Sequence, residues 1–119
     1  MRRIFLPWPD KSLWPNGRPH WAEKAKATKA YRFAAKAMLC GCPPGAVRVT
    51  FCPKPLGPMP DRDNCIAAFK AGQDGIADAL GVNDRDLTVS HVFGDRCKDG
   101  AVIVEVFAPD FEFNDGAAE

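Results

Sequence analysis

Residues 46–52, Ala-Val-Arg-Val-Thr-Phe-Cys, are the stretch from which the fold follows. The apolar side chains at the second, fourth and sixth positions alternate with Arg48 and Thr50. Because successive side chains of a β-strand point to opposite faces, this alternation predicts a half-buried strand. Such a strand requires a layer packed over its apolar face.

A short strand and a long helix are predicted before this central strand. Residues 3–6 (Arg-Ile-Phe-Leu) favour a strand that ends at Pro7 and Pro9, because proline cannot donate to a strand ladder. Residues 20–39 are rich in Ala, Lys and Glu, which predicts a helix that ends at Gly41.

A second helix and two more strands are predicted after a proline-rich connector. The helix runs to about Leu80, and Gly81 ends it. Residues 87–93 and 101–107 favour strands, which we expect the polar turn 94–100 to join as a hairpin.

The resulting order β-α-β-α-β-β predicts an α+β fold in one domain. The economical arrangement is a mixed sheet of about four strands packed with two helices. We expect the domain to span residues 1–108 and residues 109–119 to be an acidic, frayed tail.

Length and composition exclude several classes of protein. The chain has 119 residues, 46% of them hydrophobic, which suits one globular domain. No apolar run approaches the roughly 20 residues needed to cross a bilayer, and the start lacks the pattern of a signal peptide. We therefore expect a cytoplasmic protein with no membrane partner. The cysteines are odd in number, five, and poorly spaced for zinc, so we interpret them as reduced thiols.

The net charge of +1 hides a strong asymmetry along the chain. Residues 1–54 carry a net charge of +9, and residues 55–119 carry −8. A basic half suits contacts with phosphate. The acidic half would repel a polyanion unless cations lay between them, which is a first indication of a metal-dependent nuclease.

A group of aspartates is the most informative feature of the acidic half. Asp61 and Asp63 lie one residue apart where a loop meets the second helix, and the chain reversal after that helix brings Asp84 back. Hard cations prefer oxygen ligands, and no His or Cys accompanies these aspartates. The pattern therefore favours Mg²⁺ or Mn²⁺ over zinc.

Lys70 is the candidate cation of the same site. It lies seven residues after Asp63, so in a continuous helix the two positions differ by only about 20° around the axis. Its ammonium group would lean back toward the carboxylates and balance charge on a phosphate. Asp74 falls on the same face of the helix.

Each of these residues also has an ordinary structural interpretation. Asp61 or Asp63 alone is typical of a helix N-cap. Lys70 with Asp74 or Asp78 is typical of surface charges, and Asp84 alone is typical of a turn. Both interpretations remain open at this level.

Taken in order, these motifs resemble the RusA family of Holliday junction resolvases, known from bacteria and their phages. The matching pieces cover roughly residues 4–107 and are Leu6-Pro7-Trp8-Pro9 with Asn16, Asp61-x-Asp63-Asn64, Lys70-x-x-x-Asp74 and Gly81-Val82-x-Asp84.

The resemblance implies a homodimer that needs Mg²⁺, with Mn²⁺ as a substitute, and resolves four-way DNA junctions by paired symmetric nicks. It assigns Asp61, Asp63 and Asp84 to metal binding and catalysis, and Lys70 to the catalytic lysine. The chain departs from the family in two respects. The loop after Pro9, Asp10-Lys11-Ser12-Leu13-Trp14-Pro15-Asn16, is more divergent than the metal motif. The spacing from Asp63 to Lys70 is longer by about one helical turn, and Ala67 stands where the shorter spacing would place a lysine.

The remaining expectations concern DNA contacts and alternative functions. We expect DNA binding by Lys11, Trp14, Asn16, Arg18, Lys24 and Arg62. The other basic residues of the helix, Arg32 among them, either track phosphates or form a solvated face. Core packing is expected for Trp21, Tyr31 and Phe33, and a structural role for His91. The alternative functions are a non-catalytic branched-DNA-binding protein with a relic site and a nuclease that acts on flaps or forks.

Overall fold

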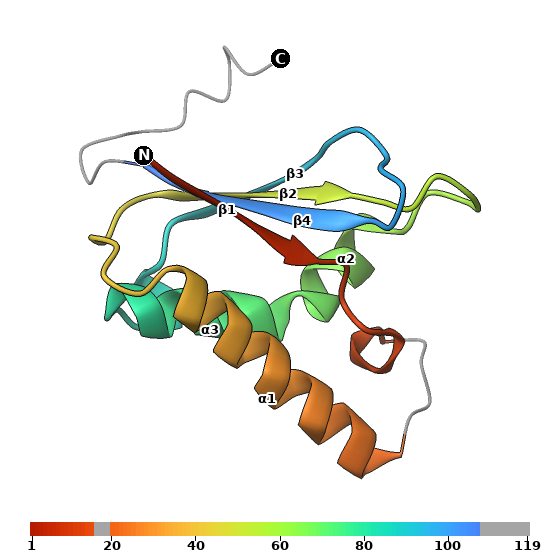
Figure 1. Ribbon diagram of the computed structural model, residues 1–119, viewed down its shortest axis with the longest axis horizontal. Coiled ribbons are helices and arrows are strands. Elements are labelled where there is room, and N and C mark those ends of the chain that lie inside the picture. Colours follow the sequence, from red (N-terminus) through yellow and green to blue (C-terminus); the bar gives the residue numbers. More distant parts are fainter. Residues whose placement is uncertain (16–19, 108–119) are drawn as a thin grey trace.

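Four strands form one mixed sheet in the order β1-β4-β2-β3 (Figure 1). The computed structural model describes residues 1–15 and 20–107. The strands are β1 (Arg2–Pro7), β2 (Val47–Cys52), β3 (Val89–Phe93) and β4 (Ala101–Val106). Strand β4 is antiparallel to both of its neighbours, whereas β2 and β3 are parallel. This confirms the predicted α+β fold and the mixed sheet of four strands.

The central strand β2 behaves as its alternation predicts. Val47, Val49 and Phe51 are buried, while Arg48 and Thr50 are half-buried on the opposite face. The helices lie against one face of the sheet only (Figure 1). The core therefore lies between the sheet and the helices.

The predicted hairpin between the last two strands is wrong. Strand β2 lies between β3 and β4, so the segment 94–100 crosses the end of β2 instead of forming a tight turn. The physical reason is burial. Strand β4 buries Val102, Val104 and Val106 and is hydrogen-bonded on both edges, whereas β3 is only partly buried and lies at the edge of the sheet.

The first helix matches its prediction. Helix α1 (Trp21–Met38) begins after His20, whose side chain accepts a hydrogen bond from the Ala22 amide. Only Tyr31 and Ala35 of this helix are buried. Trp21 and Phe33 were predicted to pack in the core but are 76% and 69% exposed. The buried face of α1 is the one that carries Tyr31 and Ala35, four residues apart, and Trp21 and Phe33 lie on other faces of the helix.

The second predicted helix is two helices. These are α2 (Arg62–Ala68) and α3 (Lys70–Leu80), and Gly81 ends α3 in the left-handed conformation as predicted. The helix is interrupted at Phe69. The Phe69 ring is fully buried and packs edge-on against Tyr31 and Phe51. Burying this ring separates the direction of α2 from that of α3.

Helix α3 lies very close to α1 because glycine replaces a side chain at the contact. A Cβ atom at Gly75 would overlap the backbone carbonyl of Arg32 and lie 2.9 Å from the Cβ atom of Ala35. A Cβ atom at Gly72 would lie 2.9 Å from the Tyr31 ring. The position of α3, and of every residue on it, therefore depends on these glycines.

The structure describes the cysteines and the helices, whereas the C-terminal tail lies outside the described residues. All five cysteines are free, in agreement with reduced thiols. Within residues 1–15 and 20–107, no helix is long and apolar enough to cross a membrane. The predicted acidic tail, residues 109–119, lies outside the described residues.

Replacing Gly75 by alanine should destabilise the protein by about 1–3 kcal/mol, because the added methyl group forces α1 and α3 apart. The free energy of unfolding in urea is the measurement. Ala67→Gly, at an exposed position of α2, is the control and should cost no more than about 1 kcal/mol of helix propensity. Equal or smaller destabilisation by Gly75→Ala would contradict the close helix contact.

Candidate functional site

Lys70, Asp74 and Asp84 form a lysine cluster beside α3, with Lys70 at the first position of that helix and Asp84 beyond its last. The Lys70 ammonium nitrogen lies 2.8 Å from Asp74 Oδ1 and 2.9 Å from Asp84 Oδ2. Asp84 begins a short 3-10 turn that follows the chain reversal at Gly81. The sequence therefore placed Lys70, Asp74 and Asp84 correctly with respect to one another.

The residues of the lysine cluster shift one another's pKa values. Hydrogen bonds from the Lys70 ammonium to Asp74 and Asp84 raise the pKa of Lys70. The same contact lowers the pKa of Asp84 below its usual value. Lys70 and Asp84 are thus held in their charged forms at neutral pH.

A second ion pair borders the lysine cluster. Arg32 of α1 donates to both carboxylate oxygens of Asp78 on α3, at 2.6 and 2.9 Å. Together with the lysine cluster, these two residues line a polar cavity of about 280 Å³. Arg32 was expected to track phosphates or face solvent, and its pairing with Asp78 was not expected. The partners are 46 residues apart and meet only because α1 packs on α3.

Asp61 and Asp63 form an acid pair at the start of α2. Asp61 occupies the N-cap position, yet its carboxylate makes no capping hydrogen bond. Asp63 lies in the first turn, and both residues are exposed. Burial, aided by the nearby Asp61 charge, raises the pKa of the Cys65 thiol to about 11. Asp61 thus takes the N-cap position that the structural interpretation expects, without the side-chain hydrogen bond of a cap.

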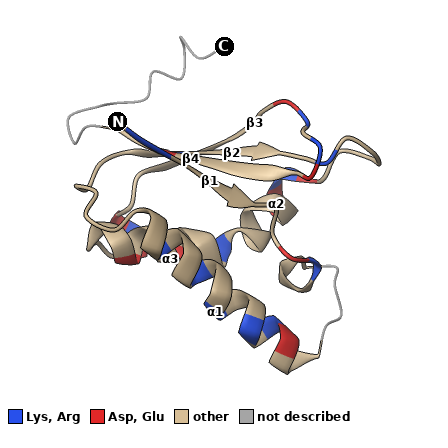
Figure 2. Ribbon diagram, in the orientation of Figure 1, with Lys and Arg blue, Asp and Glu red and all other residues tan. Residues whose placement is uncertain are grey.

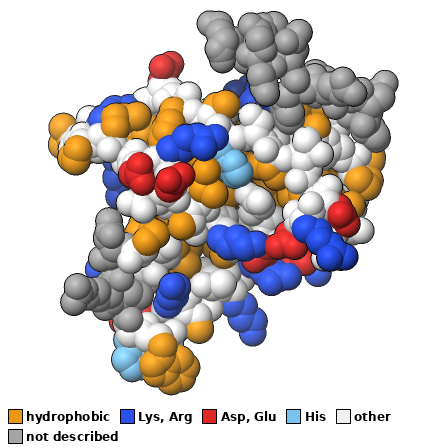
Figure 3. Space-filling model, turned by 180° about the vertical axis from the view of Figure 1, so that it is seen from behind, with side chains coloured by type: hydrophobic (Ala, Val, Ile, Leu, Met, Phe, Trp, Pro, Cys, Tyr) orange, Lys and Arg blue, Asp and Glu red, His pale blue; other side chains and the backbone are white. Residues whose placement is uncertain are grey.

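The acid pair and the lysine cluster do not combine into a metal site. Among residues 1–15 and 20–107, no three or more His, Cys, Asp or Glu side chains are placed to hold an ion. On the face that Figure 3 draws, the acidic side chains lie in separate groups. Since Asp84 is neutralised by Lys70, the described residues do not fit a three-carboxylate magnesium site, and that site stays a prediction.

The break at Phe69 explains this separation. The expectation that Lys70 leans back toward Asp63 assumed one continuous helix. Because α2 ends at Ala68 and α3 begins at Lys70, the lysine contacts Asp74 and Asp84 instead.

His91 connects the three elements around these groups. Its Nε2 atom lies 3.0 Å from Gln73 Oε1 on α3, and its ring stacks on Phe51 of β2 with an angle of 4° between planes. The Arg62 side chain of α2 donates to its backbone carbonyl at 3.1 Å. Burial, with a contribution from Arg62, lowers the pKa of His91. The histidine has a structural role here, as predicted.

The residues predicted to contact DNA are spread over several elements. Lys11 and Lys24 are exposed, and Figure 2 shows basic residues at several positions along α1. Arg62 is exposed beside the acid pair, and Trp14 is half-buried. Asn16 and Arg18 lie outside the described residues.

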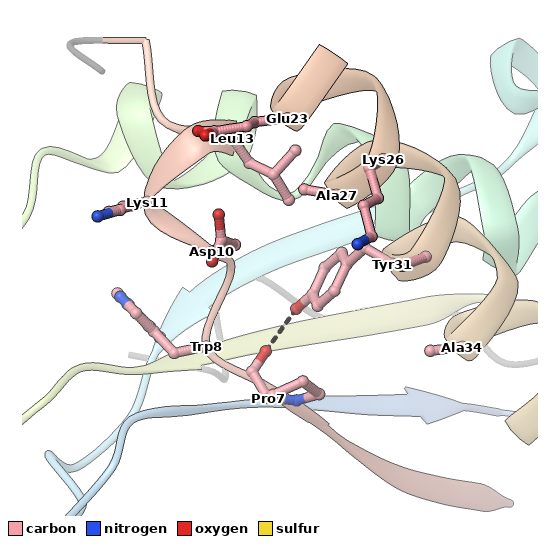
Figure 4. A pocket seen from close by; sticks show the side chains of 11 residues that line it. Pro7, Trp8, Asp10, Lys11, Leu13, Glu23, Lys26, Ala27, Tyr31 and Ala34 are labelled. Atoms are coloured by element: carbon pink, nitrogen blue, oxygen red, sulfur yellow. Dashed lines mark hydrogen bonds between the residues drawn. The ribbon is translucent and has the colours of Figure 1, made fainter. Parts of the chain in front are cut away.

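Tyr31 fixes the segment that follows β1. Its hydroxyl group donates to the Pro7 carbonyl at 2.7 Å (Figure 4), and burial raises its pKa. A cavity of about 730 Å³ lies between α1 and this segment, with Trp8 in its lining. The predicted core position of Tyr31 is confirmed, and the bond holds Trp8 at a defined place.

Comparison with known proteins does not place the chain in a family. No known family model matches the chain. An uncharacterized protein of Xylella fastidiosa (strain Temecula1 / ATCC 700964) is 41% identical over 101 residues, which span 76% of this chain. The chain spans 65% of the length of that protein. The similarity carries no activity to this chain, so the RusA resemblance remains an interpretation of its motifs.

His91 should make the stability depend on pH between 7 and 5. The pKa of His91 in the folded protein lies below the ordinary 6.5 of the unfolded chain. The neutral imidazole therefore contributes fully to the free energy of unfolding above pH 6.5, and this contribution is lost as the pH falls below 6.5. The pKa values of Asp10, Asp78 and Asp84 are also lowered, but from an ordinary value of 3.8. These carboxylates therefore change the stability only below about pH 3.8. Thermal melting should show a decrease in Tm from pH 7 to 5 that His91→Gln reduces.

Gln73→Met is the control for this measurement. It removes the hydrogen-bond partner of His91 and leaves the half-buried ring in place, so the dependence on pH should persist. An unchanged dependence in His91→Gln would contradict the assignment.

Proposed function

We propose that the chain is a DNA endonuclease of the RusA type that nicks four-way junctions. The observation that carries this proposal is the 2.9 Å contact between Lys70 and Asp84. The resemblance assigns both residues to one catalytic site, and they are 14 residues apart in the sequence. Their contact supports a shared site beside α3.

The lysine cluster offers one partly exposed cation, Lys70, to a phosphodiester. Lys70 and Arg32 place two cations at one polar cavity, and the Lys70 side chain is 57% exposed. The carboxylates of Asp74, Asp78 and Asp84 line the same cavity. A phosphate would therefore have to draw Lys70 away from Asp74 and Asp84 before the ammonium group could stabilise the developing negative charge. The exposed carboxylates of Asp61 and Asp63 would accept protons or orient water.

Three further parts of the proposal rest on the sequence and the resemblance. They are dependence on Mg²⁺ or Mn²⁺, a homodimer with two sites for two opposed strands, and action on branched DNA in the cytoplasm. The described residues do not fit a three-carboxylate ion site, so the role of a metal is a question for experiment. A panel of junctions, forks and flaps separates a junction resolvase from a flap or fork nuclease.

A second function, a branched-DNA-binding protein that does not cut, is favoured by one observation. Lys70 forms ion pairs with both Asp74 and Asp84, which leaves less negative charge at these carboxylates to attract a metal cation. In a protein with this second function, the basic residues predicted to contact DNA bind it, and the acid pair is a relic of a catalytic site.

Asp63→Asn should abolish nicking of a synthetic four-way junction in Mg²⁺ and leave binding of the junction in Ca²⁺ measurable. The change removes a charge at an exposed position and little else, so folding should be kept. Asp99→Asn, an exposed acid between β3 and β4, is the matched control and should cut normally. Full activity in Asp63→Asn would remove the acid pair from the mechanism.

Lys70→Met separates the two functions. For a nuclease, the rate of nicking should fall about 100-fold or more, as for loss of one group that stabilises the transition state, while junction binding persists. For a protein that does not cut, the wild type shows no nicking with any metal, and Lys70→Met should bind Mn²⁺ more tightly because Asp74 and Asp84 lose their cation. Lys98→Met, at an exposed position, is the control for a lost positive charge.

A further inference from the structure

A slot between two tryptophans and a proline-rich loop lies next to the acid pair. We call it the tryptophan slot; its cavity is about 280 Å³ and its lining residues are Trp8, Trp14, Pro53, Lys54, Leu56, Pro58 and Pro60. The indole rings of Trp8 and Trp14 have centroids 5.5 Å apart and planes inclined by 32°. The slot thus has an aromatic wall and a wall of prolines.

Both walls are fixed by hydrogen bonds. The Trp14 indole nitrogen donates to the Pro9 carbonyl at 3.1 Å, which sets the orientation of the ring. On the other side, Arg96 donates through Nη1 to the carbonyl groups of Lys54, Pro55 and Gly57 at 3.0–3.1 Å. Arg96 therefore holds the proline-rich loop in one conformation and is a positioning residue for the slot.

The tryptophan and lysine side chains of the slot converge at Gly100. A Cβ atom at Gly100 would lie 3.0 Å from Trp8 Cβ and 3.2 Å from Lys54 Cγ, and the residue has φ +72°. No other residue type would allow this approach without strain. The slot thus combines aromatic faces with the stem of a cationic side chain.

We propose that the tryptophan slot binds one unpaired nucleobase of the DNA substrate, with Lys54 at its phosphate. This proposal rests on the proposed action on DNA and names the part of the substrate that is recognised. Every base has a π-face that stacks on aromatic side chains, and the ammonium group of lysine attracts phosphate. The cavity lies just below the roughly 300–1,000 Å³ of sites for drug-sized ligands, which suits a single base.

Two further observations favour DNA as the occupant. Leu56 and Met59 of the loop are 89% and 51% exposed, and apolar side chains of this kind insert between base steps and hold them apart. In addition, Pro60 lines the slot and is followed directly by Asp61. A base seated in the slot would bring its backbone to the acid pair.

The test compares two oligonucleotides that differ only in their bases. A labelled single strand of eight thymidines and the same strand with abasic sites are titrated by fluorescence anisotropy, without divalent metal and at one salt concentration. The wild type should bind the thymidine strand about tenfold more tightly, as stacking of one base predicts. Equal affinity for the two strands would overturn the proposal.

Variants then locate the preference. Trp14→Ala should lose it, whereas Trp21→Ala, which removes a 76% exposed tryptophan of α1, should keep it. Lys54→Met should weaken binding of both strands to the same extent. Loss of the preference in Trp21→Ala, or its persistence in Trp14→Ala, would place the stacking elsewhere.

Two measurements keep the result interpretable. Leu56→Ser changes a side chain that is almost fully exposed, so it folds; it should lower affinity for a four-way junction more than for linear duplex. Displacement of the thymidine strand by an oligoproline peptide at equal concentration would overturn the proposal in favour of a proline-rich protein partner. Because no metal is present, the binding result is independent of whether the protein cuts DNA.

Discussion

The close contact between α1 and α3 is the constraint on which the rest of the structure depends. Gly75 allows the backbone of α3 to approach Arg32 where any side chain would overlap it, and Gly72 leaves room for the Tyr31 and Phe69 rings. This contact fixes the layer of helix beneath the sheet. It also decides where the beginning of α3 lies, and with it Lys70.

The candidate site follows from that packing more than from its local motif. The buried Phe69 separates α2 from α3, so the acid pair and the lysine cluster belong to two helices with different directions. Lys70 consequently bonds to Asp74 and Asp84, which come after it in the chain. The proposed nuclease therefore has its positive charge and part of its negative charge already paired within one cluster.

The opposite charges of the two halves of the chain are partly matched inside the molecule. Arg32 pairs with Asp78, and Arg48 pairs with Glu105 across neighbouring strands, so basic residues of the first half meet acidic residues of the second. The tension between an acidic half and a DNA partner is smaller than the linear sequence indicates. Lys54 and Lys11 remain on the surface beside the tryptophan slot and the segment after β1, where phosphate can reach them.

Local sequence determined the elements of this protein, because alternation, helix propensity and the glycine after α3 act over a few residues. It also determined that Lys70, Asp74 and Asp84 meet, since one helix and one reversal join them. Only the tertiary structure decided that β4 lies between β1 and β2, that Phe69 divides a helix, and that Arg32 pairs with Asp78. Those outcomes depend on which surfaces are buried against each other, and burial is a property of contacts between residues far apart in the chain.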